Sequence, residues 1–231
     1  MSSNPTDDTR KMILHAAVER ILHYGYSKTT MAEIARDCSM SAGNIYRFFA
    51  SKLDIAEAMA QKFNEESYLT FAKIAARKDT AANRLRELFH YELARTYSAI
   101  EEEAKILEVA EVLGAERPLY MNDKLARERV FLVQILEAGI KTGEFRALEN
   151  PNEIAEMWQS ALMKFRFPQL FSRLTLPKLQ RELDGVMDLL LAGLSPGSAV
   201  PAPWDGVTAA TGEACPVTGE PIESSSIKID Q

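Results

Sequence analysis

The sequence predicts an all-α protein in which a small N-terminal helix-turn-helix unit precedes a larger helical domain. Apolar residues recur at the three- and four-residue spacing of amphipathic helices from residue 10 to residue 194. No segment alternates β-branched residues as a strand would. Prolines are scarce inside the periodic segments and lie at their borders. The chain is therefore expected to be a string of helices with short connections.

The expected helices lie at residues 10–24, 30–37, 42–48, 52–77, 80–99, 102–114, 119–142, 151–167 and 177–193. A clear start is Asn150, where a capping residue, the first-turn Pro151 and the acid Glu153 stand in order. We divide the chain into a head, residues 1–52, and a body, residues 53–194. Residues 195–231 hold 5 of the 10 prolines and 4 of the 11 glycines, which predicts a disordered or loosely docked tail.

The charge of the chain is unevenly distributed. With 231 residues and a formal net charge of −6, it is not a wholly basic nucleic-acid coat protein. Residues 1–62 hold 8 basic and 7 acidic side chains, whereas the rest holds 19 and 26, so phosphate would be met at one end only. No apolar run approaches the ~20 residues of a membrane span, and no signal-peptide core is visible. Cys38 and Cys215 are too few for a disulfide framework, so we expect a cytoplasmic protein. We expect neither a membrane partner nor a cofactor.

The segment from Gly25 to Lys52 carries the most information. Thr30 and Glu33 form a capping box at the start of one short helix, and Ser41 is a good N-cap for the next. Two short helices joined by a three-residue turn make a helix-turn-helix, and the small residues that open the second helix suit a DNA major groove. From the pattern alone, a helical hairpin in a bundle core remains the alternative.

The same segment resembles the DNA-binding head of the TetR family of bacterial transcriptional regulators. The resemblance covers residues 10–56 and is carried, at matching spacing, by Tyr24-Gly25-Tyr26, Thr29-Thr30, Ile34-Ala35, Ser41, Gly43, Tyr46, Phe49 and Lys52. It implies that Thr30, Tyr46 and Lys52 meet DNA phosphates. It also implies that a recognition helix begins at residues 41–44. The DNA-binding candidates are Thr30, Ser41, Ala42, Gly43, Asn44, Tyr46, Arg47 and Lys52. A half-buried Tyr46 and a solvated Lys52 are the alternatives.

Three positions depart from the family pattern. Cys38-Ser39 replaces the usual Ala-Gly, and a serine with positive φ costs on the order of 1 kcal/mol, so a differently shaped turn is expected. Phe48 stands where the family often has a polar ring, and a phenyl ring cannot bond a phosphate. Cys38 lies on the inward helix face, which favours a buried thiol over a redox sensor.

The helix expected at 177–193 is apolar on most sides, which suggests that a partner chain covers one of them. The resemblance implies a two-fold dimer interface that also uses the helix at 151–167. The candidate dimerisation residues are Leu162, Leu179, Leu183, Val186, Met187 and Leu190. A fully internal helix in a monomer is the alternative.

The resemblance also implies an effector cavity among the helices of the body. The candidates to line it are Phe63, Phe89, Glu92, Thr96, Gln134, Trp158 and Phe165, although simple core packing explains most such residues. The aromatic side chains favour a flat hydrophobic or aromatic small molecule. Glu92 suggests that a cation could be tolerated.

These observations predict a homodimeric, ligand-responsive regulator, which we expect to be a repressor released from a near-palindromic operator by a small hydrophobic effector. The alternatives are an activator or a protein-responsive regulator of the same fold, and, in another class, a helical enzyme or an interaction module with a vestigial helix-turn-helix. No catalytic triad, paired carboxylates, metal-ligand cluster or glycine-rich phosphate loop is visible, so the chain is not expected to be an enzyme.

Overall fold

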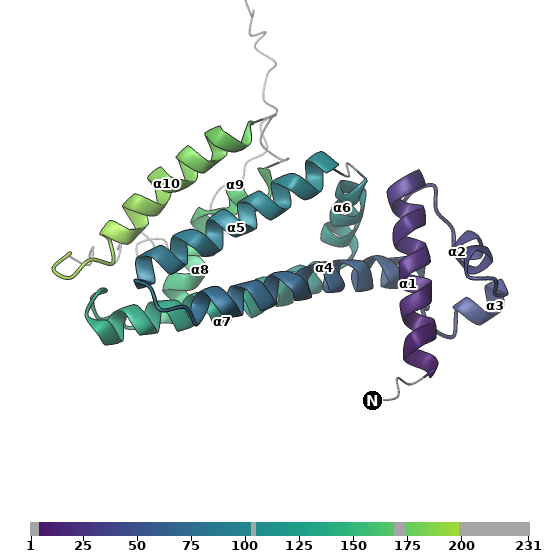
Figure 1. Ribbon diagram of the computed structural model, residues 1–231, viewed down its shortest axis with the longest axis horizontal. Coiled ribbons are helices and arrows are strands. Elements are labelled where there is room, and N and C mark those ends of the chain that lie inside the picture. Colours follow the sequence, from purple (N-terminus) through teal and green to yellow (C-terminus); the bar gives the residue numbers. More distant parts are fainter. Residues whose placement is uncertain (1–4, 103–104, 169–173, 199–231) are drawn as a thin grey trace, which may run out of the picture. The chain divides into compact units, whose positions relative to one another are not determined.

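The computed structural model describes residues 5–102, 105–168 and 174–198, and all regular structure in these ranges is helical (Figure 1). The described residues belong to one compact unit, residues 1–198; the predicted tail lies outside them from residue 199 onward. The helices are α1 (Pro5–Tyr24), α2 (Met31–Asp37), α3 (Ala42–Ile45), α4 (Lys52–Ala75), α5 (Ala81–Glu102), α6 (Ile106–Glu116), α7 (Pro118–Thr142), α8 (Pro151–Ala161), α9 (Met163–Arg166) and α10 (Leu176–Ala192).

The head has a core of its own, built by α1, α2, α3 and the start of α4. Its buried side chains include Ile13, Ile34, Ile45 and Phe49, and the thiol of Cys38 is buried among them as predicted. Burial raises the pKa of this thiol, which keeps it protonated and unreactive. These contacts fix α2 and α3 against α1 and the start of α4.

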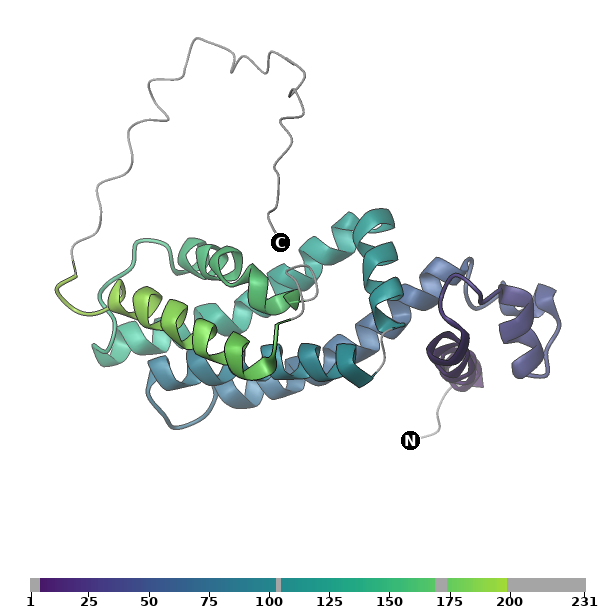
Figure 2. The same ribbon diagram turned by 90° about the horizontal axis from the view of Figure 1, so that it is seen from above.

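The body surrounds a second, larger core. In it α4 packs on α7, α5 on α7 and α10, and α8 on α7 (Figure 2). The core side chains include Phe71, Leu85, Leu93, Leu132 and Ile135. A third, smaller cluster of Ile21, Ala56, Val109 and Leu113 joins α1, α4 and α6, so the head meets the body through apolar contact.

Two helices end earlier than the sequence predicts. The second helix of the helix-turn-helix ends at Ile45 instead of residue 48, since the next amides, Arg47 and Phe48, bond three residues back and tighten the chain into a turn. This turn delivers Phe49 into the head core. The helix expected at 151–167 breaks at Leu162 into α8 and α9, and both Phe165 and Arg166 of α9 are buried.

Ser39 takes the left-handed conformation itself. It is the one non-glycine residue with a positive φ, 54°, among those described. Its amide donates to the carbonyl of Arg36 at 3.0 Å, and the amide of Met40 donates to that of Ala35 at 2.9 Å. The turn between α2 and α3 therefore keeps a geometry that favours glycine, and a side chain there carries a steric cost.

Replacing Ser39 with glycine should stabilise the protein. We expect Ser39→Gly to raise the free energy of unfolding by about 1 kcal/mol, because the left-handed backbone costs glycine almost nothing. Urea denaturation followed by circular dichroism measures this change. The control is Ser98→Gly in the C-terminal part of α5, which should destabilise by about 0.5 kcal/mol through lost helix propensity. Equal effects of the two changes would contradict the strain at Ser39.

Candidate functional site

The first helix of the helix-turn-helix begins with the predicted capping box. The Thr30 hydroxyl oxygen accepts from the Glu33 amide at 3.3 Å, and the Thr30 amide donates to the Glu33 carboxylate at 2.9 Å. The bonds from Thr30 hold the pKa of Glu33 below its usual range. Thr30 thus fixes where α2 starts and remains exposed at that helix end.

The outer face of α3 is open and carries small residues. Ser41 caps the helix by accepting from the Asn44 amide at 3.2 Å. Ser41, Ala42 and Gly43 are exposed, Asn44 is half-buried, and a Cβ added at Gly43 would meet nothing within 4 Å. Tyr46 is 53% exposed and is not part of the head core, in contrast to the alternative of a core tyrosine, and Arg47 beside it is exposed too. The turn therefore presents a narrow backbone flanked by a phenol and a guanidinium.

Lys52 is held by the protein instead of being solvated. Its ammonium donates to the carbonyls of Tyr26 at 2.6 Å and Thr29 at 2.8 Å, and lies 4.1 Å from the centre of the Tyr26 ring. Burial lowers the pKa of Lys52. Two of its three N–H donors are committed to the loop between α1 and α2, which leaves one for a phosphate.

Helix α6 of the body also forms hydrogen bonds with the loop between α1 and α2. The Glu108 carboxylate accepts from the Ser27 amide and from the Ser27 hydroxyl, both at 3.1 Å, and these bonds lower the pKa of Glu108. A Cβ at Gly25, whose φ is 95°, would lie 2.9 Å from this carboxylate, so glycine is required there. The Lys105 ammonium donates to the His23 carbonyl. The sequence prediction missed Glu108, whose only signal is an acid inside an apolar helix.

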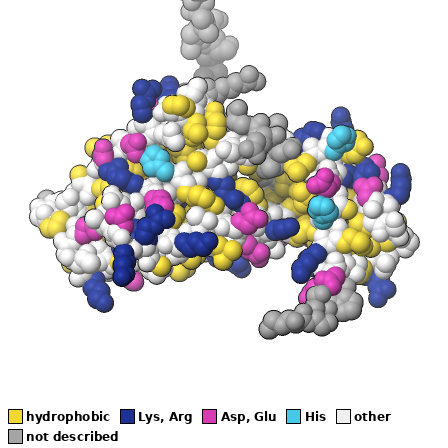
Figure 3. Space-filling view, viewed as in Figure 1, with side chains coloured by type: hydrophobic (Ala, Val, Ile, Leu, Met, Phe, Trp, Pro, Cys, Tyr) yellow, Lys and Arg dark blue, Asp and Glu magenta, His cyan; other side chains and the backbone are white. Residues whose placement is uncertain are grey.

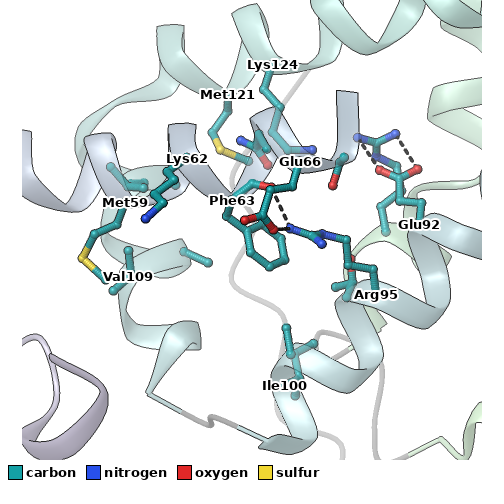
Figure 4. Close-up of a pocket in the computed structure, with 18 of the residues that line it drawn as sticks. Met59, Lys62, Phe63, Glu66, Glu92, Arg95, Ile100, Val109, Met121 and Lys124 are labelled. Atoms are coloured by element: carbon teal, nitrogen blue, oxygen red, sulfur yellow. Dashed lines mark hydrogen bonds and ion pairs between the residues drawn. The ribbon is translucent and has the colours of Figure 1, made fainter. Parts of the chain in front are cut away.

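A cavity of about 420 Å³ lies among α1, α4, α5, α6 and α7 (Figure 4). Of the effector candidates, Phe63, Glu92 and Thr96 line it. Three others do not, which corrects the prediction: Phe89, Trp158 and Phe165 belong to the body core, where large apolar side chains pack on each other. Gln134 is also wrong, because it is exposed and does not line the cavity.

One wall of the cavity is ionic. The Arg166 guanidinium donates to Glu92 at 3.0 Å and to Glu128, and Lys124 pairs with Glu128. Burial raises the pKa of Glu92. Burial also opposes ionisation of Glu128, but Arg166 and Lys124 hold the pKa of Glu128 below its ordinary value. The sequence prediction missed this group because its members are dispersed over three helices.

The dimerisation candidates divide into two sets. Leu162, Leu179, Leu183 and Met187 are fully buried in their own chain, so the prediction that they face a partner is wrong. Val186 and Leu190 are half-buried. The exposed apolar side chains on these helices are instead Met157 of α8, 60% exposed, and Leu189 of α10, 76% exposed. Helices α8 and α10 lie at the same end of the body (Figure 2).

Basic and acidic side chains are interspersed over the face shown in Figure 3. Any contact with a charged partner on that face therefore depends on individually placed side chains instead of a broad field of one sign. Within the described ranges, no group of histidine, cysteine and acidic side chains could hold a metal ion. No helix among the described residues combines the length and apolar character needed to cross a membrane.

An exposed helix-turn-helix on a helical body is the architecture of a DNA-binding transcriptional regulator. Two family profiles match the chain: "Bacterial regulatory proteins, tetR family" at residues 13–59, and "Tetracyclin repressor-like, C-terminal domain" at residues 81–187. The chain belongs to the TetR family.

Similar proteins carry regulator names. The HTH-type transcriptional repressor KstR2 of Rhodococcus jostii (strain RHA1) is 25% identical over 64% of this chain and 76% of its own. The HTH-type transcriptional regulator YhgD of Bacillus subtilis (strain 168) is 25% identical over 81% of this chain and 97% of its own. A TetR-family regulator from Mesorhizobium loti, 16% identical, superposes with a TM-score of 0.64 over 84% of this chain and 100% of its own. The fold is thus shared well beyond sequence similarity.

The bonds of Lys52 predict that its removal costs stability. We expect Lys52→Ala to lower the free energy of unfolding by about 2 kcal/mol, since two carbonyls lose a charged donor. Thermal and urea denaturation measure the loss, with the exposed Lys28→Ala as the control. Unchanged stability, with a DNA salt slope reduced by about one unit, would show instead that the ammonium serves a phosphate.

Proposed function

We propose that the protein is a homodimeric repressor that binds a near-palindromic operator through α2 and α3 and is released by a small, largely apolar effector. The observation that carries this proposal is the open outer face of α3. At Gly43 that face has no side chain, and nothing lies within 4 Å of where a Cβ would be. A backbone so exposed can approach base edges closely in a major groove.

The DNA contacts follow from this arrangement. Ser41, Ala42, Gly43 and Asn44 lie against base edges or the backbone at the start of α3. Tyr46 and Arg47 are exposed beside them and give their hydroxyl and guanidinium to phosphates. Thr30, at the N-terminal end of α2, meets another phosphate. Lys52 acts mainly by fixing the loop on which these residues depend.

The dimer forms through the outer faces of α8 and α10. Met157 and Leu189 are the large exposed apolar side chains there, and Val186 and Leu190 border them. Gly185 has open space where a Cβ would lie, which permits close approach of a partner helix. A two-fold axis at this surface pairs the heads and explains a near-palindromic operator.

Release from the operator follows from one helix, α6, which both lines the cavity and contacts the head. Leu107, Val109 and Leu113 of α6 line the cavity, and Glu108 of the same helix holds the Ser27 loop. Val18 and Leu22 of α1 line the cavity as well. An effector that binds more tightly to a displaced α6 shifts the population toward a head position that does not fit the operator. The name of the relative KstR2, a repressor, supports the sign of regulation.

Adding a methyl group at Gly43 separates DNA binding from folding. We expect Gly43→Ala to leave stability unchanged or slightly higher, since the Cβ meets no protein atom, and to weaken operator binding at least about tenfold by holding α3 off the bases. Genome-wide mapping of bound DNA in the native host supplies the operator, and fluorescence anisotropy gives the affinity.

The control for this substitution is Gly114→Ala in α6, a helical position that is equally open. It should leave operator affinity unchanged. Unaltered affinity in the Gly43→Ala protein would remove the outer face of α3 from the DNA interface.

A charge on the exposed face of α10 should disrupt the dimer. We expect Leu189→Glu to weaken dimerisation at least about 100-fold, because an unpaired carboxylate would be buried at the interface. Analytical ultracentrifugation measures the constant. Leu119→Glu on α7 is the matched control, since Leu119 and Leu189 are both 76% exposed. A dimer that survives the α10 change but not the α7 change would move the interface to α7.

A further inference from the structure

The cavity has an unusual charge balance for an apolar pocket. Its charged side chains are Lys62, Arg95, Lys124, Arg166, Glu66, Glu92 and Glu128, four basic and three acidic. All three acids are engaged: Glu92 and Glu128 by Arg166, and Glu66 by Arg95 at 3.1 Å. The three acids are therefore committed to basic side chains and are not free to bind a cation inside the cavity.

Two donors in this wall lack acceptors. The Nε atoms of Arg95 and Arg166 are buried and have no hydrogen-bond partner, although Nη2 of Arg95 and both Nη atoms of Arg166 are bonded. The Arg166 side chain is only 3% exposed. Buried guanidinium N–H groups without an acceptor are costly, and a carboxylate is the acceptor that best suits them.

The two arginines are related through Glu92 of α5. Arg95 lies one helical turn beyond Glu92, so these two side chains share one face of α5. Glu92 in turn accepts a hydrogen bond from Arg166. The Arg95 guanidinium also lies 3.9 Å from the centre of the Phe63 ring and donates to the Phe63 carbonyl at 2.7 Å. These contacts hold the guanidinium in place on the cavity wall.

The opposite part of the cavity is apolar. Figure 4 shows Met59 and Val109 across the cavity from Arg95 and Glu92. Leu22 of α1 and Leu107 of α6 also line it. Lys62 lies near Met59 but is exposed, so its ammonium stays hydrated and does not compete with Arg95 and Arg166.

From this geometry we propose that the effector is an amphiphile with one carboxylate, anchored by Arg95 and Arg166, whose apolar body lies against α1 and α6. The inference rests on the proposed effector function and adds the chemical class of the ligand. It reverses the sign of charge expected at Glu92, because that carboxylate already belongs to Arg166 and is not available to a cation. The apolar body then contacts the helices that meet the head.

Three probes of equal chain length test the inference: dodecanoate, 1-dodecanol and dodecylammonium. Each is titrated into the full chain by isothermal calorimetry, dodecanoate and dodecylammonium below their micellar concentrations and 1-dodecanol below its solubility limit. We expect dodecanoate to bind at least about tenfold more tightly than dodecanol, and dodecylammonium to bind most weakly. Equal affinities for dodecanoate and dodecanol, or a preference for dodecylammonium, would overturn the carboxylate while leaving an apolar effector standing.

Arg95→Gln locates the anchor, since Arg166 joins three helices and its variants could fail to fold. We expect this change to weaken dodecanoate at least about tenfold and dodecanol less than about twofold. The matched control is Arg86→Gln on the same helix, because Arg86 pairs with Asp188 and does not line the cavity. A preference for dodecanoate that persists in Arg95→Gln would overturn the inference.

Operator binding by the same samples separates this inference from the proposed function. If none of the three probes binds, the inference is overturned, whether or not DNA is bound. If the probes bind as expected but no operator is bound, the anchor stands and the proposed regulatory function fails.

Discussion

Arg166 joins three helices at a point where its side chain is only 3% exposed, so water screens its charge very little. Its guanidinium, on α9, bonds Glu92 of α5 and Glu128 of α7, and Lys124 completes the charge balance. Taking such charges out of water is costly, and the cluster persists only because each member is paired. Loss of one member would leave a buried charge unpaired, which is far more destabilising than loss of an exposed pair. All four members line the cavity, so the cluster ties α5, α7 and α9 together at one of its walls.

The same cavity is built partly from elements that support the head. Residues of α1 and α6 line it, and α6 also carries Glu108, which fixes the loop between α1 and α2. Lys52 fixes that loop from the other side by bonding the carbonyls of Tyr26 and Thr29. Under the proposed function, a ligand that displaces α6 would therefore act on the support of the helix-turn-helix without touching it. The coupling needs no long pathway, since one helix belongs to both sites.

The sequence predicted local features better than distant ones. The capping residues Thr30, Ser41 and Asn150 were identified because a cap and its partner lie within a few positions. The early end of α3 was missed because it depends on the burial of Phe49 in the head core. The apolar sides of α10 were recognised, but which of them faces inward is decided by packing on α5. Arg166 and Glu92 are 74 positions apart, so no spacing could reveal their pairing.

Helix α4 begins in the head at Lys52 and ends in the body at Ala75 without interruption. At 24 residues it is a rod about 36 Å long. Pivoting such a rod by about 5° about one end sweeps the other end through about 3 Å, as simple leverage requires. That sweep approaches the rise of one base pair, about 3.4 Å. In the proposed dimer, a pivot of this size directed along the DNA axis would thus displace each head from its target by nearly one base pair.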